Sequence, residues 1–206
     1  MVRFSSEDGA NPVHFLNSVQ RKQYRTQIFG NVGLTFHLLP NLDLKTQLGI
    51  DSHNYTNREY GPRDVHDFGK GDQGNAYQSN SSTLYWQEET YLTYKNSFGN
   101  HRINAMAGLS WQERTYESFN ATAKTFADDY YGYHNMAAGT QRPSVGSDHD
   151  RWAMNSYFLR IGYSYGDRYM ATVTGRYDGS SKFGKNNKYA FFRLPVWLGI
   201  FRMKSL

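Results

Sequence analysis

Apolar and polar residues alternate one by one along several stretches of this chain. In the first stretch, which begins near Gln23, one face carries Tyr24, Thr26, Ile28, Val32, Leu34 and Phe36. The second stretch, from Leu42 to about His53, repeats the pattern after a short Pro40–Asn41 connection. Strict alternation is the period of a β-strand that has one apolar face and one polar face. We therefore predict two antiparallel strands joined by a tight turn.

Four further stretches show the same alternation, and they cover about 83–96, 103–112, 151–165 and 169–177. Residues from Tyr189 onward are aromatic and strand-like as well. Short turns at Gly99–Asn100 and Gly166–Asp167 alternate with long polar links over 54–82 and 115–150, and another polar loop opens at Asp178. This rhythm is typical of membrane barrels, whose turns are short at one end and whose loops are long at the other. We predict an all-β, antiparallel up-and-down meander of about seven strands, as a segment of a transmembrane β-barrel.

One acidic residue interrupts the apolar face of the third stretch. Glu88 has the same parity as its apolar neighbours Leu84, Trp86 and Leu92. A carboxylate that faces lipid is costly at the bilayer midplane and less costly near the interface. We expect Glu88 to lie near the rim of the barrel, or next to a β-bulge that shifts the register.

The composition is compatible with spanning strands and excludes spanning helices. Aromatic residues make up 17% of the chain, and the mean hydropathy is −0.76. No run approaches the roughly 20 apolar residues of a spanning helix, whereas a spanning strand needs only about 9–11 residues with every second one apolar. Aromatic residues at the strand ends fit the interfacial girdles of a barrel, although a soluble β core would also hold them. They include Tyr55, Trp86, Tyr94, Trp111, Trp152 and Tyr169.

Charge and cysteine content narrow the partners further. The formal net charge is +5, but Lys and Arg are scattered singly among acidic residues, so we expect no nucleic-acid partner. The chain has no Cys, which excludes disulfides, thiolate metal sites and a thiol nucleophile. Its first residues, Met1 to Gly9, show neither the apolar segment nor the cleavage site of an export signal.

No motif in the sequence predicts catalysis, a cofactor or a metal site. The string from Gly162 to Gly166 matches the nucleophile elbow of α/β-hydrolases, but Ser164 lies inside an alternating strand and no helix follows. The run from Gly179 to Lys185 lacks the hydroxyl residue and the helix of a phosphate-binding loop. The acidic clusters at Asp128–Asp129 and Asp148–Asp150 lack EF-hand spacing, so solvated loop charge is the default interpretation.

The second long link contains the best candidate for contact with a ligand. Four ring-bearing residues lie close together beside two acidic residues, Asp128 and Asp129, and they are Tyr130, Tyr131, Tyr133 and His134. Stacking aromatic rings with flanking carboxylates suit the capture of a sugar or a peptide on an exposed loop, and loops on a rigid scaffold often carry binding. The alternative is a loop that packs on itself.

From about Asn11 to Phe192 the chain resembles the SusC/RagA family of TonB-dependent outer-membrane transporters. The most specific stretch has the family pattern R-x-D-G-S-S-x-F-G-x-N-N, and its matching residues are Arg176, Asp178, Gly179, Ser180, Ser181, Phe183, Gly184, Asn186 and Asn187. We interpret these residues as a structural loop in which Gly179, Gly184 and the two Asn residues supply turns with positive φ.

This resemblance implies a middle slice of a barrel of about 22 strands in the outer membrane. It implies wall and extracellular loops of an importer of glycans or peptides, not active alone. The implied partners are the lipid bilayer, a TonB-type energy-coupling protein and a surface lipoprotein that binds glycans or peptides. Two alternatives remain open at this point: a soluble carbohydrate-binding β-sandwich, and a small complete outer-membrane barrel of about eight strands.

The resemblance ends at Phe192. We expect residues 1–192 to be the partial barrel and 193–206 to be an aberrant tail, because the family usually continues with Pro-Ser and another alternating strand. Restoring one base before Arg193 gives a continuation of the expected kind, so the tail is interpreted as the product of a frameshift.

Overall fold

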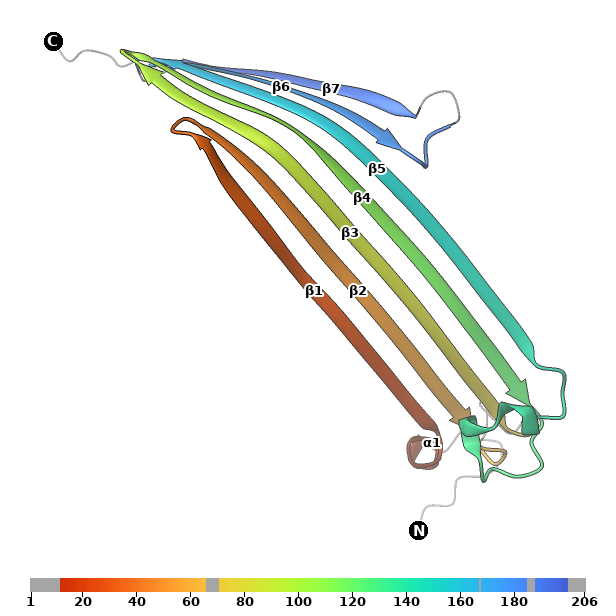
Figure 1. The fold of residues 1–206 in the computed structure, drawn as a ribbon. Helices are drawn as coiled ribbons and strands as arrows, with labels where there is room; N and C mark the ends of the chain where they lie inside the picture. The colour runs from red at the N-terminus through yellow and green to blue at the C-terminus, as the bar shows by residue number, and fades with distance from the viewer. Residues whose placement is uncertain (1–11, 66–70, 167, 185–187, 200–206) are drawn as a thin grey trace. The chain divides into compact units, whose positions relative to one another are not determined.

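The computed structural model describes residues 12–65, 71–166, 168–184 and 188–199. For residues 197–199 it describes the backbone alone. A short helix, α1 (Pro12–Ser18), precedes seven strands. These are β1 (Gln20–Leu39), β2 (Leu42–Gly61), β3 (Asn75–Phe98), β4 (His101–Lys124), β5 (Ser144–Tyr165), β6 (Tyr169–Ser180) and β7 (Tyr189–Gly199), with two single-turn 3₁₀ helices at Gly132–His134 and Met136–Ala138 (Figure 1). Within this part of the chain, no helix has both the length and the apolar character needed to cross a bilayer.

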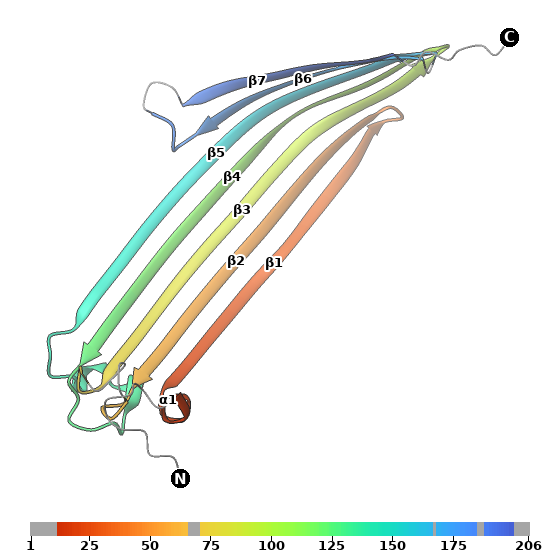
Figure 2. The same cartoon turned by 180° about the vertical axis from the view of Figure 1, so that it is seen from behind.

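The seven strands form one antiparallel sheet in which each strand pairs with its neighbours in sequence, in the order β1-β2-β3-β4-β5-β6-β7 (Figures 1 and 2). The register of the last pairs is regular: Tyr157 lies opposite Tyr177, and Val173 lies opposite Pro195. The predicted all-β up-and-down meander is therefore confirmed. A β-sandwich needs two packed sheets, and the described residues form one, so that alternative is wrong.

The chain divides into two compact units, which are described separately. The first comprises residues 1–27, 52–83 and 116–150, and the second comprises 28–51, 84–115 and 151–206. We call the first the long-loop unit, because it contains the links 62–74 and 125–143. We call the second the short-turn unit, because it contains the turns at Pro40–Asn41, Gly99–Asn100 and Gly166–Arg168.

The strands are longer than alternation predicted, and the long links are correspondingly shorter. β2 and β3 bracket a loop of residues 62–74 in place of the predicted 54–82, and β4 and β5 bracket 125–143 in place of 115–150. Backbone hydrogen bonds hold a strand together whatever its side chains are. Where a strand does not have one apolar and one polar face, its side chains do not alternate. The ends of such a strand cannot be located from the sequence pattern.

In the short-turn unit the two faces of the sheet differ as predicted. One face, which we call the apolar face, carries exposed side chains such as Ile28, Leu48, Leu92, Leu159 and Val173. On the opposite, polar face the side chain of Gln87 lies 3.2 Å from the position of a Cβ on Gly49, which places these residues of β2 and β3 side by side.

Glu88 lies on the apolar face, where hydroxyl groups bond its Oε1, while its buried Oε2 has no hydrogen-bond partner in the described structure. The hydroxyl of Thr46 donates to its Oε1 at 3.1 Å, and that of Thr90 donates to the same oxygen. Thr90 also donates to Thr46 at 2.7 Å. The alternation continues on both sides of Glu88 without the expected bulge, and two threonines from adjacent strands supply the hydrogen bonds instead.

The end of β7 departs from the face pattern of the other strands. Leu194 and Val196 lie opposite Thr174 and Thr172, on the polar face, while Arg193 lies opposite Gly175 on the apolar face. Phe192 also lies on the polar face, opposite Arg176, whereas Pro195 lies on the apolar face, opposite Val173, so the pattern is mixed from Phe192 onward. The frameshifted tail from residue 193 stays a prediction, and residues 200–206 lie outside the described part of the chain.

Candidate functional site

The two loops of the long-loop unit pack into a small core of their own. Its buried members are Tyr60, Ala76, Ala123, Phe126 and Tyr133, with Met136 and Ala138 against them. The rings of Tyr60 and Phe126 meet edge to face, with centroids 5.5 Å apart, which is a favoured aromatic geometry. The loops are therefore an ordered platform in which strand ends and loop residues share one apolar interior.

Asp129 ties the two loops together through hydrogen bonds. The phenol of Tyr60 donates to Asp129 Oδ1 at 2.7 Å, and the backbone N–H of Arg63 donates to the same oxygen at 3.2 Å. Arg63 Nε donates to Asp129 Oδ2 at 3.4 Å, and its Nη1 donates to the carbonyl of Ala127 at 2.7 Å. The carboxylate thus joins the end of β2 and the start of the 62–74 loop to the 125–143 loop.

These contacts determine the protonation states of Tyr60 and Asp129. Burial and then the hydrogen bond to the Asp129 carboxylate raise the pKa of Tyr60, so its phenol keeps its proton and remains a donor. Burial works against the charge of Asp129, but the hydrogen bonds from Tyr60 and Arg63 outweigh it and lower the pKa of this carboxyl below its usual range.

A second acidic residue, Asp72, also joins the 62–74 loop to the end of β4 and the start of the 125–143 loop. Asp72 forms an ion pair with Lys124 at 3.0 Å and accepts a hydrogen bond from the amide of Asn75 at 3.0 Å. Its backbone carbonyl accepts from the N–H of Thr125 at 2.9 Å. Thr125 has a positive φ of 63°, an uncommon conformation for a β-branched residue that these loop contacts hold in place.

The structure separates the four predicted ligand-facing residues. Tyr130 is 85% exposed and Tyr131 is 51% exposed, and their rings meet edge to face at 5.0 Å. His134 is exposed as well. Tyr133 is only 2% exposed and belongs to the core, so its prediction as a ligand-facing residue is wrong. Tyr133 cannot be told from its neighbours by sequence alone, because its burial depends on contacts with residues far away in the chain, such as Tyr60.

We expect the substitution Asp129→Asn to loosen the 125–143 loop. It removes the charge that three donors share, and because the carboxylate is partly exposed the cost should be modest, about 1–2 kcal/mol in the free energy of local opening. Native-state hydrogen exchange at the N–H of Phe126, which is bonded to Gln73, measures that opening. The matched control is Asp128→Asn, whose carboxylate accepts only from the N–H of Tyr130 among the contacts described for it.

The same contact gives the loop a pH dependence of known sign. Because the folded-state pKa of Asp129 is lowered, its stabilisation is fully present above the unfolded value of about 3.9. It is lost as the pH falls from there through the folded value. Protection of Phe126 that decays already near neutral pH would contradict this assignment.

In the short-turn unit, the motif residues of β6 make a compact polar cluster on the polar face. Arg176 Nε donates to both carboxylate oxygens of Asp178, at 2.7 and 3.0 Å, and Arg176 Nη2 donates to the hydroxyl of Ser156 at 2.9 Å. Ser181 follows and is bonded to β5 twice, because its N–H donates to the carbonyl of Ala153 and its hydroxyl accepts from the N–H of the same residue. The motif therefore fixes the end of β6 against β5.

The predicted positive φ in this motif is wrong for Gly179 and Gly184, since neither has one. Gly179 serves a different purpose: a Cβ there would lie 2.3 Å from the ring of Tyr189, which crosses it and stacks on Tyr177 with centroids 4.9 Å apart. Asn186 and Asn187 lie outside the described residues.

Two aromatic pairs on the polar face escaped the sequence analysis. Tyr85 on β3 pairs with Trp152 on β5, with centroids 6.2 Å apart, and Tyr91 pairs with Phe158 in the same way at 6.3 Å. Each pair bridges over the intervening β4. Trp152 was expected in an interfacial girdle, and this assignment is corrected by its contact with Tyr85.

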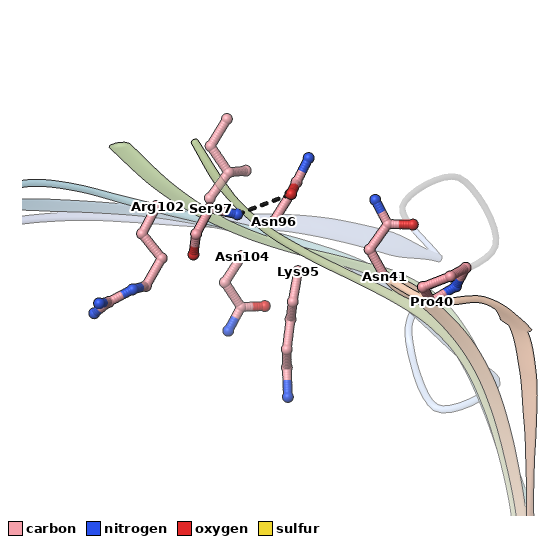
Figure 3. Close-up of a pocket in the computed structure, with 8 residues that line it drawn as sticks. Pro40, Asn41, Lys95, Asn96, Ser97, Arg102 and Asn104 are labelled. Atoms are coloured by element: carbon pink, nitrogen blue, oxygen red, sulfur yellow. Dashed lines mark hydrogen bonds between the residues drawn. The ribbon is translucent and has the colours of Figure 1, made fainter. Parts of the chain in front are cut away.

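A cleft of about 670 Å³ lies beside the short turns Pro40–Asn41 and Gly99–Asn100. Figure 3 shows Lys95, Arg102 and Asn104 extending from the same side of the ribbon into it. Six of its eight lining residues carry a polar side chain, but apolar atoms make up more than half of the lining surface, so the lining does not select a class of ligand. Among the residues that the structure describes, no group of three or more His, Cys, Asp or Glu side chains could hold a metal ion.

Known proteins give the context of these features. No family model matches the chain. The TonB-dependent receptor P3 of Formosa agariphila is 34% identical over 165 residues, which are 79% of this chain and 16% of that receptor. The TonB-dependent receptor SusC of Bacteroides thetaiotaomicron is 26% identical over 88% of this chain and 18% of its own length. Among solved structures, the RagAB peptide transporter superposes with a TM-score of 0.79 over 88% of this chain and 20% of the matched one, at 21% identity.

The chain belongs to the SusC/RagA family of TonB-dependent receptors. The likeness to RagAB, at 21% identity, concerns the fold, and it identifies the seven-stranded sheet as a segment of a receptor barrel. The chain spans 16% of the length of the Formosa agariphila receptor that it matches.

Family membership changes the interpretation of both faces. In a TonB-dependent receptor, a sheet of this kind is a wall of a membrane barrel, with lipid on its apolar side and the lumen on its polar side. The relatives are named as receptors and transporters, and none of the names describes an enzyme.

Proposed function

We propose that this chain supplies wall and extracellular loops to an outer-membrane TonB-dependent importer of glycans or peptides, and that it does not transport alone. The observation that carries the proposal is the two-faced sheet, whose fold superposes on part of the RagAB peptide transporter. Ile28, Leu48 and Leu159 are exposed on one face, as lipid contact requires, while the other face holds hydrogen-bonded polar clusters. The names of the relatives support the transport activity, and the RagAB name supports peptides as one class of solute.

The strand lengths support this placement. β1 to β5 have 20 to 24 residues each, about twice what a spanning strand needs. The strands of such a receptor therefore continue beyond the bilayer. The packed loops of the long-loop unit belong to that extension, on the cell-surface side where long loops of outer-membrane barrels lie.

The partners follow from the family and from the fold. The importer draws energy from a TonB-type protein of the inner membrane, and a surface lipoprotein delivers glycans or peptides to it. The open edges of β1 and β7 pair with further strands of the receptor, because an unpaired edge is an aggregation hazard and has unsatisfied backbone groups in a bilayer.

The exposed pair Tyr130–Tyr131 makes first contact with the solute or its carrier. In cells that produce the full-length receptor containing this chain, we expect the double substitution Tyr130→Ala and Tyr131→Ala to lower uptake of a limiting labelled solute about tenfold, the effect of losing roughly 1.4 kcal/mol of binding. Aromatic residues of this kind dominate the energetics of contact surfaces.

The matched control is Phe119→Ala, which removes another exposed ring of the same unit, 53% exposed, from β4. Surface abundance of each variant is measured in parallel. Unchanged uptake in the double variant, or an equal loss in the control, would refute the role of the pair. Uptake that persists after the proton-motive force is collapsed would refute TonB-dependent import itself.

A further inference from the structure

Aromatic rings gather where the apolar face of the short-turn unit reaches the short turns. The imidazole of His101, at the start of β4, stacks on Phe98 of β3 with centroids 5.6 Å apart, and it lies 4.9 Å from the ring of Tyr165 on β5. Its Nδ1 shares a hydrogen bond of 2.6 Å with the phenol of Tyr163. We call Phe98, His101, Tyr163 and Tyr165 the turn cluster. The three carbocyclic rings are exposed, and exposed rings at the end of an apolar strand face mark the level where a bilayer meets water.

The two short turns beside the turn cluster are joined to each other. The N–H of Gly166 donates to the carbonyl oxygen of Asn100 at 2.8 Å, so the β3–β4 and β5–β6 turns lie side by side. A pocket of about 180 Å³ opens at this junction, and it is lined by Ser97, Gly99, Asn100, His101, Arg102 and Gly166. This lining contains a guanidinium and no carboxylate among the described residues. Such a pocket favours an anionic group.

Arg168 brings a second guanidinium to the same turns. It is exposed, and its backbone N–H donates to the carbonyl oxygen of Tyr165 at 3.1 Å, which fixes its backbone next to the turn cluster. Among the residues that the structure describes, no carboxylate pairs with its side chain. Asp167, the acidic residue of this turn, lies outside the described residues. Arg168 is therefore a cation at the edge of an aromatic surface, with its hydrogen-bond donors available to a ligand.

His101 provides a donor as well as a ring. When the phenol of Tyr163 donates to Nδ1, the proton of the neutral imidazole is on Nε2. This nitrogen has no partner among the described residues. The turns thus combine guanidinium and imidazole donors with rings that face the apolar side.

We infer that the joined short turns bind the phosphate of a glycerophospholipid from the inner leaflet of the outer membrane. Arg168 and His101 donate to the phosphate oxygens, as the planar guanidinium does bidentately, and the rings of the turn cluster pack beside the glycerol and the upper acyl chains. A lipid fits better than free phosphate, because the cationic groups adjoin exposed rings that an inorganic ion does not use. The short turns of outer-membrane barrels lie on the periplasmic side, where that leaflet is. The inference rests on the barrel placement in the proposed function, and not on the imported solute.

The test counts lipids bound to the full-length receptor containing this chain. The purified receptor in detergent is mixed with phosphatidylglycerol, and native mass spectrometry gives the number of lipids that stay bound. We expect Arg168→Ala to retain about one phosphatidylglycerol fewer per receptor, and Arg168→Lys to keep most of that binding because a charge remains. The matched control is Arg160→Ala, which removes a guanidinium from the polar face of β5, opposite Thr174, and should leave the number unchanged. His101→Gln tests the second donor in the same way, and circular dichroism of each variant confirms the sheet.

Three outcomes would overturn the inference. An equal loss in Arg168→Ala and Arg160→Ala would assign the effect to overall charge. Equal retention of a diacylglycerol with the same acyl chains would show that the rings hold the molecule without its phosphate. Release of the bound phosphatidylglycerol by inorganic phosphate would make the turns a site for the free ion. Each of these outcomes leaves solute uptake unchanged, so a failure here is distinguishable from a failure of the import function.

Discussion

An arginine in place of Val173 should destabilise the sheet in a bilayer by about 2–4 kcal/mol if this position lies near the midplane, and by less toward either interface. Val173 is 54% exposed on the apolar face of β6 and lies opposite Ile161. A guanidinium there replaces apolar contact with lipid by a charge without water. Guanidinium titration of the full-length receptor containing this chain in phosphatidylcholine vesicles, followed by tryptophan fluorescence, measures the difference.

The neighbouring residue provides a matched control. Thr172 lies next to Val173 on the same strand at nearly the same depth, but its side chain is on the polar face. Its partner on β5 is Gly162, which leaves room for a larger side chain. Thr172→Arg should change the free energy of unfolding by less than about 0.5 kcal/mol, as is usual for a surface position. Equal costs at both positions would show that β6 has no lipid side, and a larger cost at Thr172 would reverse the two faces.

Alternation predicted the sheet well where the two environments of a strand differ. Leu42 to Ile50 and Leu159 to Tyr165 have one apolar face and one polar face, so their side chains record the period of two directly. Tyr55 to Gly61 and Asn75 to Asn80 continue the same strands, but within these segments only Tyr60 and Ala76 belong to the buried apolar core of the loops, which is too few to record a period of two. The pattern disappears there although the backbone pairing does not, and the predicted loops were too long for that reason.

The candidate site was less accessible to sequence reasoning, because it depends on contacts between residues far apart in the chain. Tyr130 and Tyr133 look alike in sequence, but only the second meets Phe126 and Tyr60 in the core. Trp152 was assigned to a girdle although it shares the parity of the polar residues Ser156 and Arg160, and its contact with Tyr85 corrects that assignment. Asp129, which received only a flanking role, proved to be the residue that joins the two loops.

The motif of β6 gives a related lesson about glycine. A run of Gly, Ser and Asn predicts turns with positive φ, and this was the natural reading of Gly179. In the structure Gly179 lies inside a strand, and its missing side chain makes room for the ring of Tyr189. Sequence alone does not distinguish a glycine that is needed for its backbone from one that is needed for its lack of a Cβ.

Gly108 is the clearest case of a glycine that is needed for its lack of a Cβ. We expect Gly108→Ala to lower the free energy of unfolding by about 3 kcal/mol, which is the upper end of the range for overpacking. A Cβ at this position would lie 2.5 Å from the Cβ of Tyr91, 2.6 Å from the ring of Phe158 and 2.7 Å from the carbonyl oxygen of Thr90. The ring can turn away, but the Cβ and the carbonyl oxygen move only with the backbone of β3. The substitution therefore forces β3 and β4 apart.

Gly30→Ala is the control for this change, because nothing lies within 4 Å of a Cβ on Gly30 and its φ is not positive. This variant should be neutral or slightly more stable, by up to about 1 kcal/mol, since alanine restricts the unfolded chain. The assay is the same vesicle titration. Adding Phe158→Leu to Gly108→Ala should recover only a minor part of the loss, because two of the three close contacts are independent of that ring. Full recovery would mean that the ring alone makes the glycine necessary, and that β3 and β4 tolerate a side chain between them.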